Sequence, residues 1–390
     1  MSICTRKESM MIAGVVKKNA PILELINTEL QGEFKSGGGA TVDVQIPGYG
    51  IVTKGEAIGD ATVEVAPVPV TVDVYNTAAS LSMVQKALDV DDFQKQIAEP
   101  RGAKLAATIN KLVYNEGFYN ANQSVVTSAV SFPNMAEAIG IVESTRVDGT
   151  FGAMIHPTVK ARLASSDNND FYNPSISKDL YNGIINDYGG ATFISSPDAS
   201  IVYTSWVPGS AATVSAVSEG ATSLVISDAT AVSGAICKKG TVLKVANIFN
   251  VDEFGDSLAT QRSFIVKEDF TVTSAGTVTV SVEAIHATGA LKNVSALPTA
   301  GLKVISPLEA SSSYYTGMVF SKNSLVFASA PLKEFYGADP DENMKLAGVV
   351  NVRFAAEGNI STGAQVARWD ILAGTKAVRG KAICAVYVKA

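Results

Sequence analysis

Histidine, the side chain best suited to acid–base chemistry near neutral pH, occurs twice in the 390 residues, as His156 and His286. A hydrolase would need one of them beside a nucleophile and an orienting acid. His156 precedes Pro157 at a predicted helix start, so we predict that it caps that helix, and a hydrolase that uses His156 is the alternative. His286 ends a β-type run, which gives a catalytic role less support. No G-x-S-x-G, Walker A or dinucleotide-binding motif occurs in a supporting context.

Metal ligands and reactive thiols are equally scarce. The three cysteines are too far apart for a zinc framework or a disulfide scaffold, and we predict incidental or buried reduced thiols at Cys4, Cys237 and Cys384. Two acidic clusters lack the spacing of a calcium loop, so helix caps or solvated turns are predicted for Asp89, Asp91 and Asp92 and for Asp339, Asp341 and Glu342. The sequence therefore predicts no catalytic, cofactor-binding or metal-binding residue.

Composition narrows the class of protein further. Hydrophobic residues make up 47% of the chain and charged residues 17%, which is enough apolar material for two or three cores. The net charge of −6 argues against a general nucleic-acid binder, which would present clustered basic residues to phosphate. No apolar run reaches the roughly 18 residues of a membrane span, and no signal peptide is recognisable. We expect a soluble protein that is not secreted.

Two projecting elements are predicted at the N-terminal end. After Pro21, apolar residues recur at helical spacing until the glycine run at residues 37–39, which predicts a short helical arm over residues 1–39. Alternating apolar residues then predict a long hairpin over residues 40–78 with a charged tip. Neither projection can bury its apolar face alone, so we predict intersubunit contacts at Ile22, Leu25, Ile26, Lys54, Glu56 and Asp60.

The middle of the chain changes to helix and then to mixed structure. A stripe formed by Leu105, Ile109, Leu112 and Val113 predicts a long helix that begins near Pro100, within a segment at residues 79–130. Residues 131–210 alternate helix and strand. Their predicted elements are a helix opened by an Asn134–Glu137 capping box, strands at 151–155 and 191–195, and a helix after His156.

A composition shift marks the segment 211–307. It is rich in Val, Thr, Ser, Ala and Gly in short alternating runs, which predicts a small β-barrel or sandwich that includes a hairpin at residues 270–285. Mixed α/β sequence lies on both sides of it, so we interpret it as an inserted domain. Residues 308–390 then return to mixed structure, with strands near 318–320, 324–327, 349–354 and 382–388 that complete the earlier sheet.

The order of these elements, and a few short motifs, resemble a known family. The segments Gly240–Val245, Phe264–Val266 and Arg368–Gly374 are similar to phrases in the major capsid protein of tailed bacteriophages, in the branch of the short-tailed Salmonella phage coat protein. The resemblance implies the Hong Kong 97 fold, an α+β fold, with an inserted small β-barrel domain. It divides the chain into an N-terminal arm (1–39), an extended loop (40–78), a peripheral domain with a spine helix (79–130), an axial domain (131–210), the insert (211–307) and a return to the axial and peripheral domains (308–390).

The resemblance also implies a function. The chain would be a structural subunit, not an enzyme, whose hexamers and pentamers form an icosahedral shell around phage double-stranded DNA. A scaffolding protein and a portal protein would be its partners, no membrane or cofactor would be involved, and the virion capsid would be assembled in the host cytoplasm. Two alternatives are the shell protein of a bacterial nanocompartment and, from another class, a β-rich carbohydrate-binding adhesin.

Overall fold

The computed structural model describes residues 14–16, 18–29, 40–49, 65–82, 99–166, 187–272, 276–332, 339–346, 350–359 and 364–390. The chain divides into two compact units. The first unit comprises residues 1–44, 69–113 and 326–376, and the second comprises residues 45–68, 114–325 and 377–390.

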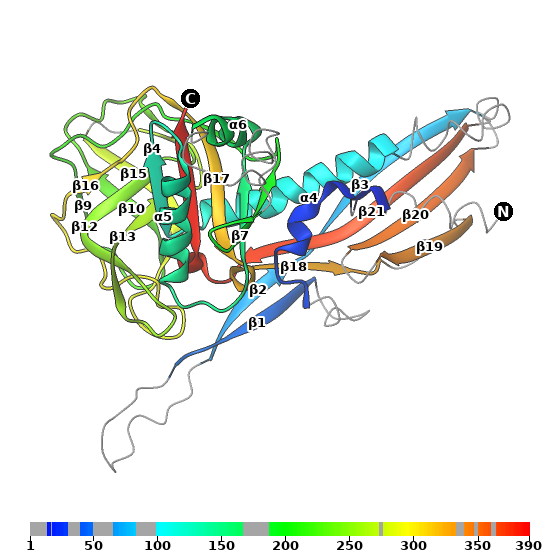
Figure 1. Ribbon diagram of the computed structural model, residues 1–390, viewed down its shortest axis with the longest axis horizontal. Coiled ribbons are helices and arrows are strands. Elements are labelled where there is room, and N and C mark those ends of the chain that lie inside the picture. Colours follow the sequence, from blue (N-terminus) through cyan, green and yellow to red (C-terminus); the bar gives the residue numbers. More distant parts are fainter. Residues whose placement is uncertain are drawn as a thin grey trace, which may run out of the picture. The chain divides into compact units, whose positions relative to one another are not determined.

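A five-stranded sheet forms the centre of the first unit. Its strands run in the order β18 (Leu325–Ala330), β21 (Ala364–Ala377), β20 (Val350–Asn359) and β19 (Asp339–Leu346), and β3 (Asp73–Ser82) also pairs with β21 (Figure 1). The strand β21, with 14 residues, pairs with β3 and β20 over most of its length. The acidic residues predicted as solvated turns near Asp339 therefore belong to strand β19, which is a correction.

The predicted spine helix is present as α4 (Glu99–Tyr119). Leu105, Ile109 and Val113 are buried as the helical stripe predicts, whereas Leu112 is only half-buried. The guanidinium of Arg101, in the first turn, donates a hydrogen bond from Nη1 to the Thr77 hydroxyl of β3 at 3.4 Å. The 3.6-residue period therefore predicts the helix correctly and misplaces one edge of its buried face.

The N-terminal segment differs from the predicted free arm. Residues 14–16 and 18–19 are helical, Pro21–Glu24 form a 3₁₀ turn, η1, and residues 25–28 do not continue it as a helix. Ile22 and Ile26 are 0% and 1% exposed. The segment is held by a hydrogen bond from the Asn110 amide of α4 to the Asn19 carbonyl and by one from the Phe327 N–H of β18 to the Asn27 carbonyl, both 2.9 Å long. The first unit itself therefore covers this apolar stripe.

The predicted hairpin begins as β1 (Thr41–Pro47) paired with β2 (Val65–Thr71), and its tip lies outside the described residues. Among the valines of residues 65–74, Val70 and Val72 are buried, and they pack with Val44, Ala328 and Leu372. Val65 and Val74 are exposed. The two prolines of β2 lie in a two-stranded sheet, where each strand has one unpaired edge on which a missing backbone N–H is tolerated.

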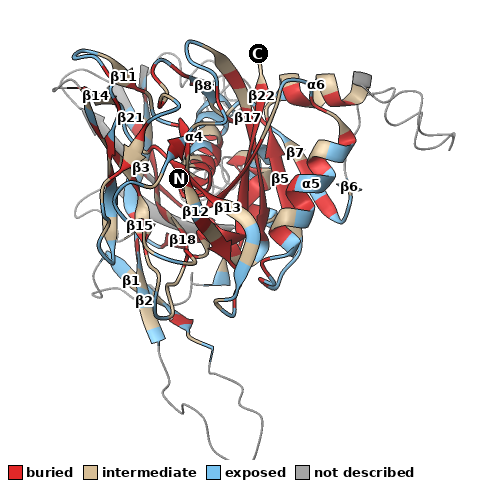
Figure 2. Ribbon diagram, turned by 90° about the vertical axis from the view of Figure 1, so that its left-hand side faces the viewer, coloured by how far each residue is buried: buried red, intermediate tan, exposed pale blue. Residues whose placement is uncertain are grey.

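The second unit contains a seven-stranded sheet. The order is β4 (Gln123–Thr127), β22 (Ile383–Lys389), β17 (Ser313–Ser321), β5 (Phe151–Ile155), β7 (Ala191–Ser195) and β6 (Asp187–Tyr188), and β8 (Ile201–Tyr203) also pairs with β17. The C-terminal strand β22 lies between β4 and β17, so the prediction that the closing strands complete the earlier sheet is confirmed. In Figure 2 these central strands are buried.

Helices α5 (Phe132–Glu143) and α6 (Pro157–Ser166) belong to the same unit. The predicted capping box is wrong. α5 begins two residues before Asn134, with Ser131 at the N-cap position and proline in the first turn. The Asn134 amide donates instead to the Thr127 hydroxyl at 3.0 Å and to the Ala129 carbonyl at 2.9 Å. Pro133 suits the first turn of the helix because its φ is fixed near the helical value and its missing N–H would have no intrahelical partner there.

Three small sheets surround one apolar core within residues 211–307, the predicted insert. They are β15 (Thr277–Ile285), β10 (Ala221–Ser227) and β9 (Thr213–Val214); β11 (Ile236–Cys237) and β14 (Phe270–Thr271); and β13 (Ser257–Ile265), β12 (Val242–Val251) and β16 (Val304–Ile305). The predicted hairpin at 270–285 is wrong, because β14 pairs with β11 whereas β15 pairs with β10. Two 3₁₀ turns, η4 (Lys322–Ser324) and η5 (Gly380–Ala382), precede β18 and β22.

Candidate assembly surfaces

The histidine predicted as a helix cap performs that role. His156 Nδ1 accepts a hydrogen bond from the Thr158 N–H at 3.2 Å, at the start of α6. Its ring also stacks on Tyr315 of β17, with centroids 4.8 Å apart. Burial lowers the pKa of His156, so the neutral ring that accepts the cap bond predominates at pH 7. His286 forms a partly exposed pair with Glu219, with 3.3 Å between Nδ1 and Oε1.

The capping bond makes α6 sensitive to acid. Protonation removes the acceptor lone pair and places a positive charge at a helix N-terminus, so the folded state binds this proton less well than the unfolded state. The contribution is present above the unfolded pKa of 6.5 and is lost as the pH falls below it. We expect His156→Asn, which keeps a capping acceptor, to lose less thermal stability than the wild type between about pH 8 and about pH 5.

A control and a contrary result define this prediction. His156→Ala, which removes the capping acceptor at every pH, should be less stable than His156→Asn at pH 8. If His156→Asn and the wild type lose the same stability on acidification, protonation of His156 does not weaken α6. Thermal unfolding followed by circular dichroism at the two pH values measures both variants.

The described cysteines are poor nucleophiles. Cys237 and Cys384 are buried free thiols, and burial raises the pKa of each to about 12. Cys4 and the cluster Asp89, Asp91 and Asp92 lie outside the described residues. Within the described parts of the chain, no group of three or more His, Cys, Asp or Glu side chains could hold a metal ion.

The six predicted intersubunit residues lie in different environments. Ile22 and Ile26 are buried within the first unit, and their assignment as intersubunit contacts stays a prediction. Leu25 is half-buried. Lys54, Glu56 and Asp60 lie outside the described residues, and their assignment stays a prediction.

Sequence reasoning missed a charged cluster in the second unit. The turn between β12 and β13 carries two buried carboxylates, Asp252 and Glu253. Asp252 Oδ2 lies 3.1 Å from an Arg146 nitrogen, in the segment that follows α5. Glu253 pairs at 2.7 Å with Arg379 and at 2.9 Å with Lys381, just before β22. These ion pairs attach the insert to the seven-stranded part of the second unit.

A buried polar seam adds to this attachment. Ser124 of β4 and Ser263 of β13 share a hydrogen bond of 2.8 Å between their hydroxyl groups, and the Ser263 N–H donates to the Asn122 carbonyl at 2.9 Å. Lys267 donates from Nζ to the Asn120 amide oxygen at 2.6 Å. These hydrogen bonds give directional contacts between the insert and the segment that leads into β4.

The Arg368–Gly374 motif lies in β21, and its contacts in the five-stranded sheet explain two of its residues. Trp369 is fully buried in the sheet. Asp370, also fully buried, accepts hydrogen bonds from the Arg353 guanidinium of β20, at 2.5 and 3.2 Å, and from Arg368 Nε at 2.5 Å. Two guanidinium groups thus neutralise one carboxylate that has no solvent, which makes Asp370 a structural residue of this sheet.

The described helices include none that is both long enough and apolar enough to cross a membrane.

Comparison with known proteins supplies the family. A family model described as P22 coat protein, gene protein 5, matches residues 184–386, which is more than half of the 390 residues. The match includes the whole insert and the C-terminal strands that return to both sheets. No curated protein sequence is significantly similar to the chain.

Solved structures supply the fold. The acid-stable capsid structure of Helicobacter pylori bacteriophage KHP30 is similar, with a TM-score of 0.51 and 10% identity, over 95% of this chain and 91% of that one. Mycobacterium phage Che8 gives a TM-score of 0.48 and 10% identity over 93% and 89% of the two chains. The capsid of cyanophage P-SCSP1u gives 0.47 and 11% over 94% and 86%. The phage-capsid fold expected from the sequence is confirmed.

Proposed function

The chain belongs to the P22 coat protein family, and from this premise we propose that its copies form hexamers and pentamers that close into an icosahedral shell around double-stranded DNA. Its role as a structural subunit of a phage capsid shell follows from the family. The single observation that carries the proposal is the family match across the insert and the returning strands. The same match favours a phage shell over a nanocompartment shell or an adhesin.

The partners and the setting of assembly belong to the same proposal. A scaffolding protein guides curvature, a portal protein occupies one vertex, and the particle assembles in the host cytoplasm before it becomes the virion capsid. The subunit acts without catalysis. A net charge of −6 supports this role, because an acidic container does not adhere strongly to packed DNA.

The deciding experiment is electron microscopy with sedimentation of the protein alone and with the product of the adjacent scaffolding gene. Closed shells with fivefold vertices, or tubes and spirals that become closed shells with the partner, support the proposal. A uniform small oligomer under both conditions would exclude it.

The charged residues predicted at the hairpin tip give a second test. The triple change Lys54→Ala, Glu56→Ala and Asp60→Ala should reduce the yield of shells several-fold, because loss of a few interface charges weakens each contact by about 1 kcal/mol. Folding of the free subunit, measured by circular dichroism, should be unchanged.

A matched control removes an exposed pair elsewhere. Lys238 and Asp269 form a 2.9 Å ion pair in the insert, and replacing both by Ala should leave the shell yield close to that of the wild type. Normal shells from the triple variant would remove these three residues from the proposed contacts.

A further inference from the structure

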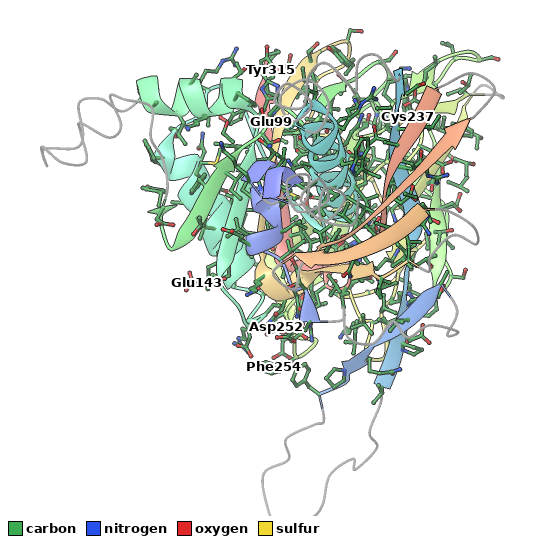
Figure 3. All side chains as sticks on the ribbon, turned by 90° about the vertical axis from the view of Figure 1, so that its right-hand side faces the viewer. Glu99, Glu143, Cys237, Asp252, Phe254 and Tyr315 are labelled. Atoms are coloured by element: carbon green, nitrogen blue, oxygen red, sulfur yellow. The ribbon has the colours of Figure 1, made fainter. Side chains whose placement is uncertain are left out.

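One exposed aromatic side chain of the second unit is supported on several sides. Phe254, in the turn between β12 and β13, is 52% exposed, and Figure 3 places it with Asp252 at the periphery. The Tyr49 ring, 49% exposed, meets it edge to face at 5.0 Å, and the Arg146 guanidinium lies 5.5 Å from its ring centroid. We name Tyr49, Arg146 and Phe254 the aromatic knob.

The turn under the knob is fixed by its own backbone. Asp252 Oδ1 accepts hydrogen bonds from the N–H groups of Phe254 and Asp256 at 3.0 and 2.8 Å. The Asp252 N–H donates to the Asp256 carbonyl at 2.9 Å, and Lys292 Nζ donates to the Gly255 carbonyl at 2.9 Å. The tip is therefore held in one conformation on both of its sides.

Backbone and side-chain groups from three distant segments also hold the turn. The Glu253 N–H donates to the Thr145 carbonyl at 2.9 Å, and the Glu253 carboxylate pairs with Arg379 and Lys381. Tyr49 donates from its hydroxyl to Glu253 Oε1 at 3.5 Å. The buried ion pairs thus present the rings of Phe254 and Tyr49 at the surface in a fixed arrangement.

A fixed aromatic group beside an arginine has the composition of an interface hot spot. Tyrosine and arginine dominate hot spots, and buried aromatic anchors supply much of the contact area. A group that is already ordered loses little side-chain entropy on binding, so more of its contact energy appears as affinity. In the isolated chain, by contrast, half of each ring remains in water.

We propose that the aromatic knob is a contact site for a second copy of this chain within the shell. The proposal rests on the shell function above, because a shell surrounds each subunit with other copies. The Asp252 and Glu253 carboxylates beneath the rings are buried and ion-paired, whereas Asp256 of the same turn is exposed and the Arg146 charge is paired with Asp252. The two half-exposed rings, and not a net charge, are therefore what the knob offers to another copy.

Photo-crosslinking in assembled particles tests the identity of the partner. Shells are assembled from protein with p-benzoylphenylalanine in place of Phe254 and are then irradiated. The expected product is a covalent dimer of this chain in shells but not in dilute free subunits, with the second peptide mapped by mass spectrometry. The proposal is overturned if the crosslinker joins position 254 only to a scaffolding protein, or only to other residues of its own polypeptide.

A truncation measures the contribution of the contact. Phe254→Ala should raise the protein concentration needed for shell assembly at least about tenfold, as for a hot-spot residue. Because the ring is half exposed and the turn is held by other groups, the thermal unfolding temperature of the subunit should change little. Val232→Ala, which truncates an exposed apolar side chain elsewhere in the insert, should leave the assembly concentration unchanged.

The two levels of the proposal fail differently. If the wild-type protein forms no shells under any of these conditions, the shell function itself fails. If wild-type and Phe254→Ala proteins assemble at the same concentration, shell function stands and the aromatic knob is excluded as a contact.

Discussion

Gly374→Ala is expected to destabilise the subunit by about 3 kcal/mol or more, at the upper end for overpacking. A Cβ at this position would overlap the carbonyl oxygen of Thr71, and it would lie 2.9 Å from the Thr71 carbonyl carbon and 3.0 Å from the Val72 Cα. These are all backbone atoms, so no rotamer change relieves the overlap. Either β21 or the junction between β2 and β3 must move. Equilibrium unfolding in urea measures the loss.

The control is the same substitution at an open site. Gly140 lies in α5, and among the described residues no atom outside the adjoining helix backbone lies within 4 Å of the position of an added Cβ. Gly140→Ala should therefore stabilise the subunit by about 0.5–1 kcal/mol, because alanine loses less backbone entropy in a helix. Equal stability of Gly374→Ala and the wild type would show that β21 and residues 71–72 do not approach this closely.

Elements with a strong local pattern could be predicted from the sequence. α4 followed from the spacing of Leu105, Ile109 and Val113, and the strands at 151–155 and 191–195 followed from short apolar runs bounded by turn residues. The helix after His156 followed from a proline at its first position. In each case the signal lies within a few residues of the element, so no knowledge of distant partners is needed.

Elements defined by distant partners could not be predicted in the same way. The apolar residues of the N-terminal segment indicated an exposed arm, but Asn110 and Phe327 anchor that segment within the first unit. The hairpin predicted at 270–285 does not form, because β14 pairs with β11 and β15 pairs with β10. Adjacency along the chain is therefore only a weak guide to strand pairing here. Strand β21 was missed because its charged residues interrupt the apolar alternation.

The candidate assembly surfaces show the same limit more strongly. Glu253 in the insert is paired with Arg379 and Lys381, more than a hundred residues away, and Tyr49, two residues after β1, joins the same cluster. The sequence Asp252–Asp256 alone is a typical polar turn around one phenylalanine. Only the fold shows that Asp252 and Glu253 are buried and that the Phe254 ring is exposed.

Asp370→Asn is the second change with a large expected effect, a destabilisation of about 3 kcal/mol. Asp370 is fully buried and pairs with two guanidinium groups, one of which, Arg353, is 8% exposed. The substitution keeps the shape of the side chain but removes the negative charge, so the buried Arg353 charge loses its compensation. Urea unfolding followed by circular dichroism measures the loss, which should reduce the yield of soluble subunit as well.

An exposed carboxylate in a comparable pair separates the effect of burial from that of charge. Asp269 pairs with Lys238 at 2.9 Å, but the side chains are 47% and 37% exposed, so Asp269→Asn should cost less than about 1 kcal/mol. If the two asparagine variants lose similar stability, Asp370 does not compensate a buried charge. If only Asp370→Asn is destabilised, the aspartate of the Arg368–Gly374 motif is required because it compensates the buried Arg353 charge. The glycine of the same motif is tested separately, by Gly374→Ala.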